Sequence, residues 1–373
     1  MRQLQHMQYA AQLLWKRSVV EQLLRDVGGF ENPPLRETVA CETPWHYRNH
    51  MRFSVNRSGQ AGLTARGSHR VLPLTSCPIA HEYINTALAV LSQQDNPRPQ
   101  VVIRCGGATR QMLLQPAPQP QVIEQLAAAG LDVRADTMEE ILAGETFRIR
   151  PSSFFQTNTA QAEKMAQMVL NGLLLQYPQT CSILKRIEEN LMPPLTPVDG
   201  DHSTRETPNK SSSFALGSDL NAAETTATHP LTVVDAYCGV GTFALMLARH
   251  VEKVIAIEES ASAIKDARWN LREVNNVEIL KGKVEELLPA LAERLDGLVI
   301  DPPRAGCQQV VLDALVQHPV ARVVYVSCDP STLARDLHIL CHQHPTYHLQ
   351  SVQPLDMFPQ TAHIECVAVL ERV

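Results

Sequence analysis

The sequence lacks the features that would place the protein in or across a membrane. It has no run of about 18 uncharged apolar residues, and its N-terminus does not follow the signal-peptide pattern. Its nine cysteines include no Cys-x-x-Cys pair, so neither a disulfide framework nor a self-contained zinc site is indicated. We therefore expect a cytoplasmic protein with no membrane span and no metal site.

Basic residues are also in short supply. The net charge of −6 argues against a protein that holds nucleic acid by charge alone. The first 70 residues nevertheless contain ten Lys and Arg against five Asp and Glu, so a polyanion would dock there, although a solvated face is the alternative. Within them, residues 45–55 alternate apolar or aromatic side chains with basic ones, a pattern that suits either RNA contact or a plain edge strand.

The 373 residues, 44% of them hydrophobic, are enough for two or three domains with sizeable cores. Residues 231–373 alternate strands and helices, which predicts an α/β fold with a mostly parallel, Rossmann-like sheet of seven strands. Residues 1–150 predict a smaller α+β domain, and 151–176 a connecting segment with a helix. Residues 177–230 are rich in Pro, Ser, Thr and Asn and predict a flexible insertion.

Cys328 stands between a predicted strand, residues 323–326, and a helix that begins with Asp329 as N-cap and Pro330 as first residue. The positive end of a helix dipole favours an anion and would lower the pKa of a thiol placed there. Cys328 is therefore a candidate nucleophile. The alternative is an ordinary buried cysteine.

A short glycine loop with Gly239 and Gly241 follows the predicted strand that ends near Asp235. The next strand ends in Glu258, whose carboxylate could accept both hydroxyls of a ribose. This combination indicates an S-adenosylmethionine site rather than a nicotinamide site, because the third glycine of the dinucleotide motif is missing. Lys283, after the third strand, lies either where an adenine edge would be or on the surface.

Two further carboxylates lie at strand ends of the same predicted sheet, Asp301 after the fourth strand and Glu365 at the start of the last. Asp301-Pro302-Pro303 is typical of amino-group methyltransferases, in which an aromatic residue comes next, but this sequence has Arg304. Asp301 is then a rigid hydrogen-bonding group or a cap of the following helix. Glu365 is a candidate general base if it faces the same cleft as Cys328, and otherwise a solvated strand start.

Taken together, the glycine loop, Asp-Pro-Pro-Arg, Ser-Cys-Asp-Pro-x-Thr-Leu-Ala-Arg-Asp and His-Ile-Glu resemble the RNA uracil-5-methyltransferase family. The resemblance covers nearly the whole chain except the insertion. It is strongest to the branch that modifies 23S rRNA, through Gln3 to His6, Trp45 to Arg48, Cys77-Pro78 and Leu355 to Pro359.

The resemblance implies S-adenosylmethionine-dependent formation of 5-methyluridine in RNA, with rRNA favoured over tRNA and a monomeric protein. It implies that Cys328 adds to uracil C6 and that Glu365 removes the C5 proton. Cofactor-binding or substrate-orienting positions are then Gln156, Tyr237, Gly239, Gly241, Thr242, Glu258 and Asp301. Thr242 replaces a frequent Asn, so its contact is less certain than the others.

The chain departs from that branch at its start, where the branch carries a barrel domain and three cysteines of an iron–sulfur cluster. Only Cys77 matches a cluster ligand, and a cubane cluster takes four, so we expect no cluster in this chain. Either the start is misassigned or barrel and cluster are missing. The competing functions are tRNA uridine methylation, amino-group methylation through Asp301, and RNA binding without catalysis.

Overall fold

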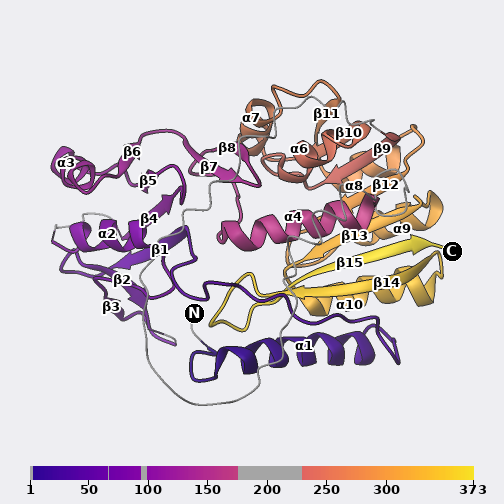
Figure 1. Cartoon of the computed structure of the whole chain (residues 1–373), viewed down its shortest axis with the longest axis horizontal. Coiled ribbons are helices and arrows are strands. Elements are labelled where there is room, and N and C mark those ends of the chain that lie inside the picture. Colours follow the sequence, from indigo (N-terminus) through magenta and orange to yellow (C-terminus); the bar gives the residue numbers. More distant parts are fainter. Residues whose placement is uncertain (1–2, 66, 94–98, 175–228) are drawn as a thin grey trace, which may run out of the picture.

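The computed structural model describes residues 3–65, 67–93, 99–174 and 229–373. Most of the predicted insertion, 177–228, lies outside the described residues. Two β-sheets organise the rest: a six-stranded sheet in the N-terminal part and a seven-stranded sheet in the C-terminal part (Figure 1). The long helix α4 (Thr159–Leu174) runs beside the larger sheet.

The larger sheet confirms the predicted α/β class. Its order is β11-β10-β9-β12-β13-β15-β14, and β15 alone runs antiparallel to its neighbours. β12 is buried along its whole length, as expected for an apolar strand covered on both faces. The strands are β9 (His229–Ala236), β10 (Val251–Glu258), β11 (Val277–Lys281), β12 (Gly297–Ile300), β13 (Arg322–Ser327), β14 (Tyr347–Leu355) and β15 (Glu365–Arg372).

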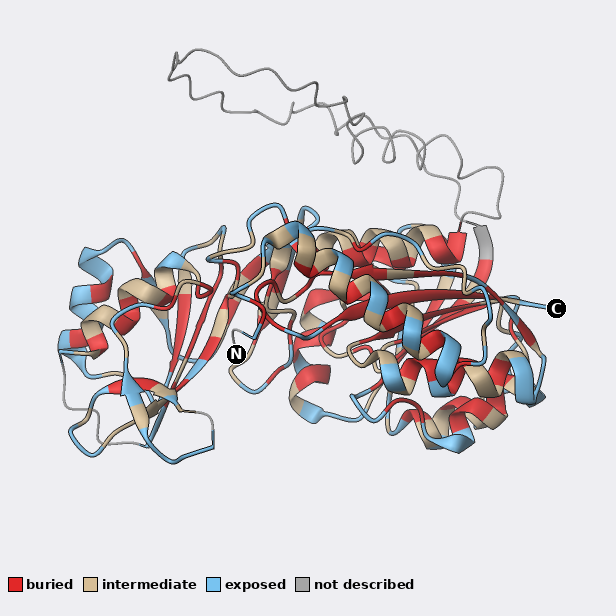
Figure 2. Cartoon of the chain, turned by 90° about the horizontal axis from the view of Figure 1, so that it is seen from below, coloured by how far each residue is buried: buried red, intermediate tan, exposed pale blue. Residues whose placement is uncertain are grey.

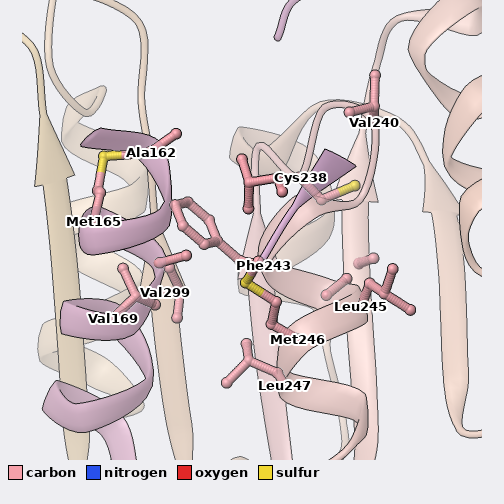
Figure 3. Packing of buried hydrophobic residues seen from close by; sticks show 14 of the residues in the cluster. Ala162, Met165, Val169, Cys238, Val240, Phe243, Leu245, Met246, Leu247 and Val299 are labelled. Carbon is pink, nitrogen blue, oxygen red and sulfur yellow. The ribbon is translucent and has the colours of Figure 1, made fainter. Parts of the chain in front are cut away.

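Helices cover both faces of this sheet because alternate strand residues point to opposite sides. Val324 of β13 packs in the core that includes α4 and α6, whereas Val323 packs in the core that includes α1 and α8 to α10. Figure 3 shows Phe243 of α6 in the first core, pointing toward Met165 and Val169 of α4. The helices are α1 (Tyr9–Asp26), α6 (Thr242–Ala248), α7 (Ala261–Asn270), α8 (Val284–Leu287), α9 (Gln309–Gln317) and α10 (Pro330–His338), with short helical turns η2 (Leu288–Ala290) and η3 (Ile339–Gln343).

The smaller sheet has a core of its own, distinct from the two cores on the faces of the larger sheet. Figure 2 shows buried residues along the strands of both sheets. Its order is β3-β2-β1-β4-β5-β6, with two helices beside it and a separate β7–β8 hairpin. The elements are β1 (His50–Val55), β2 (Ala61–Thr64), β3 (Val71–Pro73), α2 (Glu82–Leu91), β4 (Gln100–Cys105), β5 (Gln111–Gln115), α3 (Pro120–Ala128), β6 (Asp132–Arg134), β7 (Met138–Leu142) and β8 (Glu145–Ile149). The strand predicted from Trp45 begins only at His50, and Trp45 packs against the small core.

Helix α1 was predicted as part of the N-terminal domain, yet it lies against α10 of the larger part. Val20 and Leu24 of α1 are buried in the same core as α10. The chain then runs along β14, where Leu35 and Val39 form bridges to Val352 and Leu355. This N-terminal segment therefore belongs to the larger part, because the apolar face of α1 packs against α10 and not against the small sheet.

A buried polar network joins the two parts. Arg104 of β4 donates to the carbonyls of Arg150 (3.2 Å) and Ser153 (2.8 Å). From the other side, Asp266 of α7 accepts from the Arg150 amide (2.8 Å) and the Ser153 hydroxyl (2.6 Å). Residues 150–153 are thus hydrogen-bonded to Arg104 of the small sheet and to Asp266 of α7, a helix of the larger part. These bonds fix the orientation of the small sheet relative to the large one.

Within the described ranges, no helix has the length and apolar character to cross a membrane. The eight cysteines in those ranges are free thiols, and six of them are buried. No group of three or more His, Cys, Asp or Glu that could hold a metal ion is found in the described part. Cys77 is 1% exposed and its amide is bonded by Asn85 Oδ1 at 2.7 Å.

Candidate active site

Cys328 stands at the junction of β13 and α10, as predicted. Asp329 caps α10 by accepting from the Ser331 amide at 3.0 Å, and Pro330 is the first helical residue. Ser327 closes the junction, because its hydroxyl bonds the Asp329 carbonyl at 3.0 Å. The side chain of Cys328 is half-buried at the carboxyl edge of the sheet, where ligands bind in folds of this kind.

The antiparallel pairing of β13 with β15 brings Glu365 next to Cys328. Ser327 pairs with Cys366, so the next residue pair in register is Cys328 and Glu365. Glu365 is 3% exposed and its electrostatic interaction with the thiol raises the thiol pKa. Two residues far apart in sequence therefore meet in one cleft.

The expectation of a lowered thiol pKa is wrong for the ligand-free protein. Burial, followed by the nearby carboxylates of Glu365 and Asp301, raises the pKa of Cys328 to about 11, although Arg304 opposes the rise. A helix terminus contributes only about 0.3–1 kcal/mol at a partly exposed site. Desolvation and two negative neighbours outweigh that contribution, so the thiol keeps its proton near neutral pH.

The same crowding affects the carboxylates. Burial raises the pKa of Asp301 to about 7. Burial first, and then Asp301, raise the pKa of Glu365 well above its ordinary value, again opposed by Arg304. Three acidic groups and one arginine thus lie close together at this edge of the sheet, and the pKa of each acidic group is raised by its surroundings.

Helix α10 also holds the loop that carries Asp301 and Arg304. The fully buried Asp336 accepts from the Tyr325 hydroxyl (2.7 Å) and from the Cys307 amide (2.9 Å). Arg335 donates to the Ala305 carbonyl at 3.0 Å. Sequence inspection assigned these residues no role. Their signal was present, because they belong to the same Thr-Leu-Ala-Arg-Asp motif as the cysteine.

The glycine loop follows β9 in a conformation that needs small residues. Gly239 and Gly241 have φ of 57° and 86°, and Tyr237 between strand and loop has φ of 64°. A Cβ at Gly241 would lie 3.1 Å from the Leu271 side chain. The backbone can therefore come close to a ligand at this turn.

Two acidic residues brace the loop. The fully buried Asp235 accepts from the Ala244 amide at 2.8 Å, and its other oxygen is buried with no hydrogen-bond partner in the described structure. Glu258 accepts from the Gly239 amide (3.0 Å) and the Ser260 amide (2.7 Å). Each Glu258 oxygen keeps a free lone pair, which ribose hydroxyls could use.

A cavity of about 520 Å³ opens beside this loop. Its lining has one lysine against four acids; it comprises Tyr237, Glu258, Glu259, Gly282, Lys283, Val284, Glu285, Asp301, Pro303 and Gln308. The Tyr237 hydroxyl donates to Glu285 at 2.9 Å, which fixes one wall. The cavity reaches Asp301, so it adjoins the cleft of Cys328.

Of the predicted cofactor-binding residues, Tyr237, Glu258 and Asp301 line this cavity, whereas the others do not. Thr242 begins α6 just behind the glycine loop and is not part of the lining. Gln156 lies before α4, with its carbonyl bonded by Asn49 at 3.2 Å, and is also outside the lining.

The fold and the acidic cavity at the carboxyl ends of its strands define a Rossmann-like methyltransferase. A family profile described as tRNA (Uracil-5-)-methyltransferase matches residues 219–373. An uncharacterized RNA methyltransferase of Gloeobacter violaceus is 33% identical over 99% of this chain and 80% of its own length. One of Nostoc is 31% identical with the same coverage.

Among solved structures, the tRNA (uracil-54, C5)-methyltransferase of Pyrococcus abyssi, in complex with S-adenosyl-L-homocysteine, has the same fold. It matches with a TM-score of 0.67 over 98% of this chain and 84% of that one, at 21% identity. The chain belongs to the RNA uracil-5-methyltransferase family. It is an RNA methyltransferase, which removes RNA binding without catalysis from the competing functions.

Proposed function

We propose that the protein methylates C5 of a uridine in RNA through a transient bond between Cys328 and uracil C6. The observation that carries this proposal is the position of Glu365 opposite the end of β13, where its carboxylate interacts with the Cys328 thiol beside the acidic cavity. Uracil C5 is too weak a nucleophile to take a methyl group directly. Addition at C6 converts it into an enolate and divides one difficult step into easier ones.

Cys328 supplies the attacking sulfur. Its proton leaves to solvent through the open side of the cleft as the sulfur bonds to C6, and the C5–C6 π electrons move onto C5 and O4. Asp301, with a pKa raised to about 7, is placed to bond the reacting base. Arg304, whose charge opposes the rise in the thiol pKa, favours the thiolate.

Glu365 completes the cycle once C5 has been methylated. Its carboxylate accepts the C5 proton, the electrons of that C–H bond restore the C5–C6 double bond, and the sulfur leaves C6. A carboxylate with a raised pKa is a stronger base than an ordinary one, which suits proton removal from carbon. The product is 5-methyluridine, the sulfur is released as a thiolate, and Glu365 is left protonated.

S-adenosylmethionine supplies the methyl group when bound. The acidic cavity suits its cationic sulfonium, Glu258 its ribose hydroxyls, and the glycine loop a close backbone approach. We assign Tyr237, Gly239, Gly241, Thr242, Glu258, Asp301 and Gln156 to this methyl donor and its orientation.

For the substrate, we propose large-subunit rRNA, with tRNA as the alternative. The support is the set of sequence segments shared with the rRNA-modifying branch. We assign RNA recognition to the small sheet and the basic N-terminal region, and a base in folded RNA must be flipped out to reach Cys328. We further propose that the protein works as a cytoplasmic monomer.

Two measurements test this function. Mass-spectrometric mapping of 5-methyluridine in total RNA, from cells with and without the gene, should show one or more positions lost from 23S rRNA. In vitro, Cys328→Ala should abolish methylation, whereas Cys341→Ala, which changes the other half-buried thiol among the described residues, should not. Full activity of Cys328→Ala would refute the covalent route and favour amino-group methylation through Asp301.

A further inference from the structure

We infer that Lys16 of α1 is a positioning residue for Glu365, and this inference rests on the proposed role of Glu365 as base. Lys16 acts through residues 356–364, called here the β14–β15 loop. That loop leads directly into Glu365, the first residue of β15. Lys16 stands about 340 positions earlier in the chain, on a helix that reaches none of the reacting groups itself.

The Lys16 ammonium uses its three hydrogens on this loop. It donates to Asp356 Oδ1 at 2.5 Å, to the His363 carbonyl at 2.8 Å and to the Phe358 carbonyl at 3.2 Å. The side chains of Lys16 and Asp356 are both 0% exposed. One buried cation therefore fastens the start, the middle and the end of the loop to one point.

Other side chains from outside the loop bond the carbonyls between those points. Gln161 donates to Asp356 O at 2.9 Å and Asn158 to Met357 O at 3.1 Å, both from the start of α4. The Tyr47 hydroxyl donates to Pro359 O at 3.0 Å. In the described part of the chain no strand pairs with residues 357–364, so their backbone position depends on these bonds together with those from the N-terminal segment. The Leu4 amide donates to the Gln360 carbonyl (3.3 Å), and the Gln360 amide donates to Gln12 Oε1 (3.1 Å). Lys16 makes the one closest to the base, two residues before Glu365.

Stability alone gives a weak reason for this arrangement. A buried ion pair can often be replaced by apolar residues of similar volume without loss of stability, because desolvation of both charges offsets their attraction. What an apolar pair would not replace are the directed bonds to the Phe358 and His363 carbonyls. Those bonds hold the loop that leads into Glu365, whose own backbone is paired with Leu355 of β14.

This role predicts a defect in one step only. Attack by Cys328 and methyl transfer do not require Glu365, whereas removal of the C5 proton does. The test uses Lys16→Met/Asp356→Leu, which removes the bonds without leaving an unpaired buried charge. Arg25→Gln is the matched control, since Arg25 is on the same helix but is 51% exposed and pairs only with Glu21.

In single-turnover assays with labelled methyl donor, the double variant should transfer methyl at a normal rate. Its turnover should fall by on the order of 10- to 100-fold, the cost of a small misplacement of a catalytic group. The RNA–protein adduct, seen on a denaturing gel, should accumulate as it does in Glu365→Gln. Combined with Glu365→Gln, the double variant should add no further loss, because both changes affect the same step.

Equal losses in methyl transfer and turnover, or additive losses in the combined variant, would show a merely structural role and overturn the inference. Wild-type turnover would overturn it as well. RNA with 5-fluorouridine at the target separates failure of this inference from failure of the proposed function. Fluorine at C5 blocks elimination, so the covalent adduct accumulates if the proposed route is followed. The double variant should then form the adduct as well as wild type. If wild type forms none, the covalent route itself is wrong.

Discussion

The protonation of Cys328 is the most direct physical test of the site. In the ligand-free protein its pKa is raised from 9.0 to about 11 by burial and by the carboxylates of Glu365 and Asp301. Two units mean about 100-fold less thiolate at about pH 8 than an unperturbed thiol would have. We therefore expect the free enzyme to react slowly with alkylating reagents, and the rate to rise with pH until about the pKa.

Glu365→Gln separates the two main causes. The amide removes a negative charge beside the sulfur but leaves its burial unchanged, so the thiol pKa should fall while staying above its ordinary value. The pKa falls because the negative charge of Glu365 no longer repels the thiolate. More thiolate is then present at a given alkaline pH, and alkylation becomes faster. Asp301→Asn should act in the same direction with a smaller effect, since Asp301 ranks after Glu365 among the causes.

The assay is iodoacetamide alkylation across the pH range, followed by peptide mass spectrometry so that each cysteine is read separately. Cys341 is the internal control, because burial alone raises its pKa to about 12 and no carboxylate contributes. Its profile should not move in Glu365→Gln. A Cys328 pKa below that of an ordinary thiol in the free protein would refute the reasoning, because the helix terminus would then outweigh burial and charge.

Three further predictions concern residues around the site. Glu258→Gln should weaken binding of S-adenosylmethionine at least about 10-fold by calorimetry while leaving the melting temperature close to wild type, because a single weakened charge-assisted bond costs about 1.5 kcal/mol. Gly241→Ala should lower the free energy of unfolding by about 1–3 kcal/mol, since the left-handed backbone and the nearby Leu271 both oppose a Cβ. Asp336→Ala should lower the free energy of unfolding, measured with urea, by about 1–3 kcal/mol for each buried donor left without a partner, the Tyr325 hydroxyl among them. Unchanged stability would contradict the reasoning for Gly241 or for Asp336, whichever variant shows it.

Local sequence was sufficient for the elements around the active site. The valine-rich run before Ser327 could only be a buried strand, and Asp329-Pro330 is a helix start whose geometry is set by neighbouring residues. The glycine loop was predictable for the same reason, since two glycines two residues apart after a strand are a local signal, and both adopt a positive φ. These features depend on contacts within a few residues, so the sequence carries their full signal.

Two expectations failed because they depend on distant partners. Helix α1 falls within the range predicted as the N-terminal domain, and nothing in its local sequence says that α10 is the surface it covers. Likewise, the position of Cys328 at a helix terminus predicted a low pKa, because the carboxylate of Glu365 and the extent of burial are absent from the local sequence. Lys16 escaped notice for a related reason, because its partners lie on the β14–β15 loop, far from it in sequence.

The amino-acid sequence by itself therefore determined the secondary structure, the α/β class and, through its motifs, the family and the two catalytic candidates. Only the tertiary structure decided that Cys328 and Glu365 meet, since their proximity comes from the antiparallel pairing of β13 with β15. It also decided their protonation, because electrostatic interactions act through space and depend on which groups are buried together. Backbone preferences are local and can be read along the chain, whereas pairing, burial and charge fields are collective properties of the folded molecule.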